Sequence, residues 1–160
     1  MQSQESALPS MRDFLELLDQ HKELRKVTDE VNAKFEVSAI HMKVQAEKGP
    51  ALLFQNVKGF KIPVLVNLLA TRRRLALALG LPADIDNAAL NATMTERMRV
   101  PVKAEIVASG PCKETIIGAS ELDLRGYPIV TMHEKDAGPY VTGAFIVAKN
   151  PETGVQNISY

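Results

Sequence analysis

Two adjacent apolar runs constrain the fold of this chain more than any other feature. Residues 51–57 and 62–69 show little alternation with polar residues, and the turn-forming Lys58, Gly59 and Phe60 separate them. Continuous apolar runs of this length are typical of strands that protein covers on both faces. We therefore expect two buried strands in this part of the chain.

The segments before and after these runs have apolar residues at helical spacing. Capping residues precede several of them, and helix-stopping residues follow. Ser10 followed three residues later by Asp13 is the signature of a capping box, Thr71 and Asp84 are suited to cap two later helices, and residues 24–27 are typical of a short strand. Glycine and proline follow several of the helical repeats, as they do at helix ends. The segments that we expect to be helical are 11–23, 36–47, 72–79 and 84–98.

The pattern changes after Ser109, Gly110 and Pro111, where we place a boundary between two structural units. Residues 101–108 before it are expected to be extended. Beyond it, turn residues separate four strand-like pieces, and 150–154 has the proline and glycine of a tight hairpin turn. The expected strands are 113–117, 127–132, 141–149 and 155–160. The prediction is an α+β chain with units at 1–110 and 111–160, the second ending inside a strand and therefore incomplete.

Charge and cysteine content exclude several classes of function. Nineteen basic and nineteen acidic side chains cancel, so no field of one sign favours nucleic acid or an anionic membrane. No apolar run is long enough to span a bilayer, and the polar start lacks the features of a signal peptide. The single Cys112 forms no internal disulfide, as is usual in a reducing compartment. We expect a cytoplasmic protein.

Four groups of polar residues are candidate sites by residue type and spacing. His21, His41 and His133 are not at metal-ligand spacing, and His41 on an apolar helical stripe is best explained as structural. The arginines 72–74 begin a helix and could bind an anion, but a solvated face is the commoner outcome. Residues 133–136 carry acid, base and cation, yet an extended backbone points them in alternating directions, which favours a charged loop over catalysis.

Asn157 is the fourth candidate, because it lies in a strand-like run between Val155 and Ile158. A buried amide there requires a partner. A neighbouring side chain and a metal ion are both compatible with the pattern.

The order of several short motifs resembles one family of enzymes. The series covers nearly the whole chain from Met11 to Tyr160, and its members are MRDFLELL at 11–18, GPALLFQNVKG at 49–59, PV through NL at 63–68, TRRR at 71–74, ALALG at 76–80, DAGPY at 136–140 and NPETGVQN at 150–157. In composition, order and spacing the series resembles the N-terminal portion of UbiD-type decarboxylases. These enzymes reversibly decarboxylate aromatic or α,β-unsaturated carboxylic acids with prenylated FMN.

The resemblance implies a fold and a cofactor site. It implies an N-terminal α/β unit followed by the beginning of a split β-barrel like that of flavin reductases. Asn157 matches a ligand of the divalent metal, usually Mn2+, that holds the flavin phosphate. Ile158 and Ser159 are then expected to offer backbone contacts to that phosphate or to a companion K+ ion, and Tyr160 to begin the flavin-contacting stretch. The resemblance also implies a flavin prenyltransferase that supplies the cofactor and a full-length parent that is a homo-oligomer.

The same resemblance places the catalytic residues outside this chain. The family's arginine is expected two positions past Tyr160, with its glutamate pair and remaining metal ligands further on, so we assign no catalytic residue here and expect the 160-residue chain alone to be inactive. His133, Glu134 and the segment 138–142 resemble branches acting on hydroxyaryl or acrylic acids more than the ubiquinone-pathway branch. The alternative is a non-catalytic folding or interaction module without bound cofactor.

Overall fold

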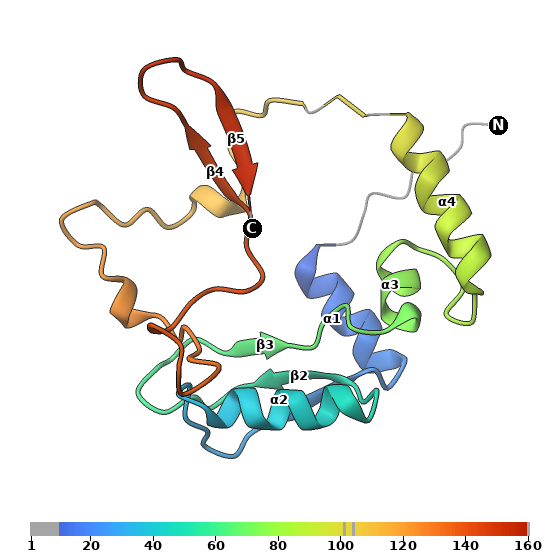
Figure 1. Cartoon of the computed structure of the whole chain (residues 1–160), viewed down its shortest axis with the longest axis horizontal. Helices are drawn as coiled ribbons and strands as arrows, with labels where there is room; N and C mark the ends of the chain where they lie inside the picture. The colour runs from blue at the N-terminus through green and yellow to red at the C-terminus, as the bar shows by residue number, and fades with distance from the viewer. Residues whose placement is uncertain (1–9, 101, 104, 160) are drawn as a thin grey trace.

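The computed structural model describes residues 10–100, 102–103 and 105–159, and it has the mixed α+β architecture that the sequence predicts (Figure 1). These residues form four α-helices, five strands and two short 3-10 helices. In chain order the elements are α1 (Met11–Gln20), β1 (Leu24–Val27), α2 (Glu36–Ala46), β2 (Ala51–Phe54), β3 (Val64–Val66), α3 (Arg72–Ala78), α4 (Asn87–Arg99), η1 (Pro111–Lys113), η2 (Leu124–Gly126), β4 (Ile146–Lys149) and β5 (Gln156–Ser159).

The first three strands form one sheet in the order β1-β2-β3. β1 and β2 pair in parallel through the α2 crossover, with Val27 opposite Phe54. β3 returns antiparallel to β2, with Leu52 opposite Val66. The central strand is therefore the first of the two apolar runs, and β3 is an edge strand.

Alternate residues of β2 pack into two separate cores, one on each face of the sheet. Ala51 packs with Phe14 and Leu18 of α1 and with Leu77 of α3. On the other face, Leu52 and Phe54 pack with Val37 of α2. Because helices cover both faces, both sets of side chains leave water, which explains why this run lacks polar alternation.

Three of the four predicted helix starts, at Met11, Glu36 and Arg72, are confirmed, and the fourth is wrong. The Asp13 carboxylate accepts hydrogen bonds from the Ser10 amide at 2.9 Å and hydroxyl at 2.7 Å, and these bonds lower the pKa of Asp13. The Thr71 hydroxyl accepts from the amide of the third residue of α3, as expected. α4 begins after Asp86 rather than Asp84, because the amide of Ile85 closes a turn on Pro82 and leaves Asp86 to cap the helix.

The strand-rich prediction for the second half is confirmed only in the terminal hairpin. Residues 113–117 form no strand, because the Lys113 amide donates to Gly110 and starts a 3-10 turn instead. Residues 127–132 make a single bridge, between Thr131 and Lys34, since Pro128 has no amide hydrogen to continue a ladder. The expected strand 141–149 is shorter, covering β4 alone. β4 and β5 pair antiparallel as a hairpin.

The hairpin stands apart from the three-stranded sheet (Figure 1), and all eight of its strand residues are exposed. The beginning of a split β-barrel in the second unit and a domain boundary at residue 110 both stay predictions. No helix in the described part of the chain is long and apolar enough to cross a membrane.

Candidate functional site

The residues expected to hold metal and cofactor lie together on β5. Asn157 pairs with Ala148 of β4, Ile158 with Val147 and Ser159 with Ile146. Side chains alternate along a strand, so Asn157 and Ser159 share one face of the hairpin and Ile158 is on the other. Tyr160 lies outside the described residues.

The turn that leads into β5 fixes the register of Asn157. The Asn150 side-chain oxygen accepts from the amides of Glu152 at 2.8 Å and Thr153 at 2.9 Å. Gly154 follows with a φ of 70°, a left-handed conformation that favours glycine, and its amide donates to the Asn150 carbonyl. This closed turn sets which face of β5 carries the Asn157 amide.

The donor chemistry around Asn157 fits one ligand of a hard divalent cation. A neutral amide oxygen on an exposed strand face is a suitable ligand, and such ions usually take six or more oxygen ligands or waters. Within the described residues, no group of three or more histidine, cysteine, aspartate or glutamate side chains is placed to hold a metal. Asn157 would therefore supply one ligand among several.

The two charged motifs that the sequence suggested are engaged in local structure. The Asp136 carboxylate accepts the amide of His133 at 2.8 Å, which makes 133–136 a closed turn rather than an array of side chains facing one substrate. At the start of α3, Arg73 and Arg74 both contact Glu23, at 2.8 and 2.9 Å. These two arginines are thus committed to a carboxylate of this chain and not to an external anion.

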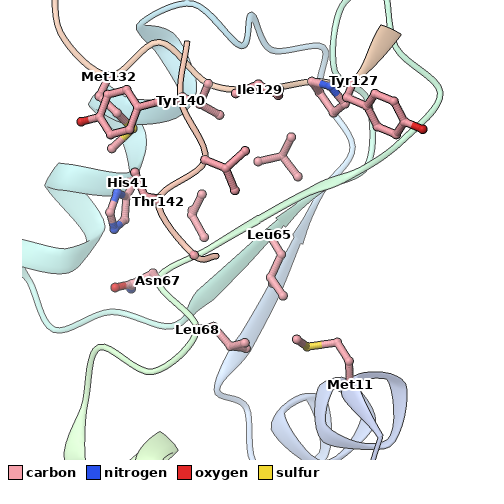
Figure 2. A pocket seen from close by; sticks show the side chains of 16 residues that line it. Met11, His41, Leu65, Asn67, Leu68, Tyr127, Ile129, Met132, Tyr140 and Thr142 are labelled. Carbon is pink, nitrogen blue, oxygen red and sulfur yellow. The ribbon is translucent and has the colours of Figure 1, made fainter. Parts of the chain in front are cut away.

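A cavity of about 460 Å³ lies between the outer edge of β3, α2 and the segment 127–143 (Figure 2). We call it the β3 cavity. Two hydrogen bonds hold the segment to the N-terminus of α2, from the Phe35 amide to the Thr131 carbonyl and from the Thr131 amide to the Ala33 carbonyl. Its lining comes from residues 64–68, 127–130 and 140–143 together with Met11, His41 and Met132.

Two polar side chains with buried atoms line this mostly apolar cavity. The Asn67 amide nitrogen donates to the carbonyls of Pro50 at 2.8 Å and Gly49 at 3.2 Å. Its oxygen and His41 Nδ1 are buried and have no hydrogen-bond partner among the described residues. Burial lowers the pKa of His41. The sequence predicts a structural role for His41, and its imidazole, whose charged form is disfavoured by burial, lies at the cavity wall.

Sequence reasoning missed Asn67 and the buried role of Arg74. Asn67 follows β3 with a φ of 62°, and asparagine is among the few residues that tolerate this conformation, so its place directly after an apolar run was the available signal. Arg74 is fully buried although it stands in a run of three arginines. Only its position on the inward face of α3 distinguishes it from its neighbours.

Comparison with known protein families identifies the chain. Residues 15–94 match the 3-octaprenyl-4-hydroxybenzoate carboxy-lyase N-terminal domain, and residues 105–160 match the Rift-related domain of the same carboxy-lyase. The chain belongs to the UbiD family. An uncharacterised protein from Synechocystis sp. is 30% identical over 92% of this chain, and the chain spans about a third of that relative, 34% of its length.

Solved structures of UbiD-class enzymes share the fold. An evolved dimeric form of HmfF from Pelotomaculum thermopropionicum, in complex with prFMN, is 33% identical with a TM-score of 0.80, over 94% of this chain and 34% of that one. Vanillic acid decarboxylase from Sedimentibacter hydroxybenzoicus is 28% identical with a TM-score of 0.82, over 92% and 33%. The apo 3,4-dihydroxybenzoic acid decarboxylase AroY from Klebsiella pneumoniae is 27% identical with a TM-score of 0.77, over 92% and 33%.

Proposed function

We propose that this chain is the N-terminal part of an enzyme that reversibly decarboxylates aromatic or α,β-unsaturated carboxylic acids with prenylated FMN. The observation that supports this most is the position of Asn157, exposed on β5 at a register fixed by the hairpin turn, inside the stretch that matches the second UbiD domain. When bound, the cofactor would accept the electrons that remain when carbon dioxide leaves.

In this proposal the β4–β5 hairpin holds the phosphate end of the cofactor. Asn157 would give its amide oxygen to Mn2+, and Ile158 and Ser159 would present backbone groups to the phosphate or to K+. Tyr160 would continue toward the flavin. The hairpin would form the start of the split barrel, with residues 1–110 as a separate α/β domain.

The proposal extends to a whole protein longer than this chain, because the chain spans about a third of the length of its relatives. We propose a cytoplasmic homo-oligomer that receives its cofactor from a flavin prenyltransferase. Similar structures include an HmfF complex with prFMN and decarboxylases named for vanillic and 3,4-dihydroxybenzoic acids, which supports an aromatic acid as substrate.

The test replaces Asn157 by leucine in the full-length protein, with Gln156→Leu as the matched control. Gln156 is the preceding residue of β5, carries the same amide group and faces the other side of the hairpin. Loss of a ligand should weaken metal affinity by at least the ~10–100-fold typical of changes in the groups that orient ligands. Metal analysis, flavin absorbance and thermal melting of both variants measure the effect.

Asn157→Leu should lose metal and flavin and keep its melting temperature without cofactor, whereas Gln156→Leu should keep all three. Unchanged metal and flavin content with a lower melting temperature would show that Asn157 only stabilises the hairpin. A native full-length protein that takes up no flavin when prenylated FMN and Mn2+ are supplied would favour the non-catalytic module instead.

A further inference from the structure

The β4–β5 hairpin has no buried face that could select how its two strands pair. All eight strand residues are exposed, including Asn157 and the Ala148 that lies opposite it. The register of a strand is strongly specified where one of its faces is buried, and in an exposed hairpin it depends on the turn. Within the described part of this chain, the turn at 150–154 is therefore what sets the register of β5.

A shift of this register by one residue would remove the Asn157 amide from its face of the hairpin. Because side chains alternate along a strand, such a shift moves every side chain of β5 to the opposite face. Gln156 or Ile158 would then lie opposite Ala148. Isoleucine offers no oxygen ligand, and glutamine carries its amide on a longer side chain.

The Asn150 side chain makes the two shortest side-chain hydrogen bonds of the turn. Its Oδ1 accepts from the amides of Glu152 at 2.8 Å and Thr153 at 2.9 Å. The backbone adds a bond from the Asn150 amide to the Val155 carbonyl and one from the Gly154 amide to the Asn150 carbonyl. A side chain without an acceptor at position 150 would leave two amides of the turn without this partner and favour other loop conformations.

The Asn150 oxygen is not itself available to a cation. An amide oxygen has two lone pairs, and the amides of Glu152 and Thr153 occupy both. Turning the side-chain amide over would direct its NH2 donors at two N–H groups and lose both bonds. An effect of Asn150 on metal binding therefore has to pass through the backbone of the hairpin.

We propose that Asn150 is a positioning residue of the metal site: its side-chain oxygen holds the turn in the conformation that fixes the register of β5, and this register presents the Asn157 amide to the divalent cation. The proposal rests on the function proposed above, because it takes Asn157 as a metal ligand. It adds a requirement at position 150, namely an acceptor oxygen on a short side chain, which asparagine and aspartate both meet.

The test compares the Mn2+ affinity of three variants in the full-length protein. Asn150→Leu keeps a similar volume but removes the acceptor, so the affinity should fall about 10–100-fold, the range typical of groups that orient ligands. Asn150→Asp keeps the acceptor and should bind Mn2+ at least as tightly as the native protein. Glu152→Leu is the matched control, because it changes an exposed side chain of the same turn, keeps the amide and should bind as the native protein does. Electron paramagnetic resonance of free Mn2+ gives the dissociation constants, and thermal melting without metal shows whether each variant is folded.

A cross-strand disulfide separates a positioning role from a purely structural one. Lys149 and Gln156 lie directly opposite each other on the face away from Asn157, and opposed residues of an antiparallel pair are close enough for a disulfide. With Cys112 replaced by serine, Lys149→Cys and Gln156→Cys should form this bond and hold the native register. In the oxidised protein, Asn150→Leu should then bind Mn2+ as tightly as the same protein with Asn150, and reduction should bring back the loss. Mass spectrometry confirms the bond.

Three results would overturn the positioning role. The first is an Asn150→Leu variant that binds Mn2+ as the native protein does. The second is an Asn150→Asp variant that binds as weakly as Asn150→Leu. The third is an oxidised Asn150→Leu protein whose affinity is not restored. If Asn150→Leu does not fold without the disulfide, the oxidised form still decides.

Failure of the proposed function gives a different pattern. A native protein that binds no Mn2+, or an Asn157→Leu variant that binds it normally, would overturn that function and this inference with it. Mn2+ affinity that falls in Asn157→Leu but not in Asn150→Leu would contradict only the positioning role of Asn150.

Discussion

The buried guanidinium of Arg74 lies 2.9 Å from the carboxylate of Glu23, a residue 51 positions earlier in the chain. The nitrogen Nη1 that contacts Glu23 also donates to the Gly49 carbonyl, and Nε donates to the Leu68 carbonyl, each at 3.0 Å. The buried Nη2 has no hydrogen-bond partner among the described residues. A single side chain thereby links the α1–β1 connection, the α2–β2 turn and the β3–α3 connection. The first unit of this chain thus contains one buried charge that is paired with a carboxylate and hydrogen-bonded to two carbonyls, as the cost of burying a charge requires.

Replacing Arg74 by methionine should destabilise the chain strongly. The change keeps an apolar stem but leaves Glu23 and two backbone carbonyls without their buried donor. Breaking a buried ion pair from one side typically costs about 3–5 kcal/mol, and the remaining contact of Glu23 with Arg73 places the expectation near the lower end. Chemical denaturation gives the change in the free energy of unfolding. Arg72→Met, on an exposed neighbour, is the control and should stay within about 0.5 kcal/mol. Equal losses in the two variants would contradict this role.

Asn67 combines a left-handed backbone with two hydrogen bonds, and two substitutions separate these contributions. Asn67→Gly loses the bonds to Gly49 and Pro50 but adopts the φ of 62° freely. Asn67→Ala loses the bonds and must also hold a Cβ in this conformation, which costs about 1–2 kcal/mol. Thermal or urea unfolding should therefore rank alanine below glycine by roughly that amount. Alanine and glycine variants of equal stability would show that the backbone relaxes at this position.

Gly49 lies where the end of α2 turns into β2, and a larger residue does not fit. A Cβ there would meet Val44 Cγ1 at 2.7 Å and the Val44 carbonyl oxygen at 3.1 Å. Gly49→Ala should destabilise the chain by about 1–3 kcal/mol, the usual cost of overpacking. Gly126→Ala meets no atom within 4 Å and should change stability by less than about 0.5 kcal/mol. Comparable melting temperatures for the two would mean that Val44 moves aside at little cost.

The sequence predicts the first half of the fold well because local and tertiary signals agree there. The caps at Ser10 and Thr71 satisfy amides within a single turn, and the run containing Ala51 is apolar because helices cover both of its faces. Such signals depend on residues a few positions apart, so a pattern reveals them. The β4–β5 hairpin was predictable for the same reason, since Asn150 and Gly154 form its turn.

The sequence does not predict features that depend on distant partners. Residues 127–132 have the composition of a strand, yet they make one bridge, between Thr131 and Lys34, a residue nearly 100 positions earlier that lies outside the named strands. Arg74 has the same appearance in the sequence as Arg72, and its position on the inward face of α3 makes it a core residue. The β3 cavity likewise lies between three segments that are distant in the chain, so no local motif predicts it.

His41 predicts how the stability of this chain should change with pH. Burial lowers the pKa of the folded imidazole below its ordinary value of 6.5, which the unfolded chain retains. Above pH 6.5 the ring is neutral in both states, so its contribution to stability is fully present. As the pH falls below 6.5, the unfolded chain takes up the proton first, and the free energy of unfolding falls with it. The loss continues until the pH passes the lowered pKa of the folded state.

Urea unfolding between pH 7.5 and pH 5 of the native chain, His41→Leu and His21→Gln would measure this contribution. His41→Leu removes the titrating ring, so its stability should depend less steeply on pH than that of the native chain across this interval, whatever its absolute stability. His21→Gln keeps His41 and should retain the native slope. The variants separate the contribution of His41 from that of the other titrating groups, because each variant lacks a single histidine and shares every other titratable group with the native chain. If His41→Leu loses stability toward pH 5 as steeply as the native chain, the imidazole at the cavity wall is not responsible, and its burial does not disfavour the charged form.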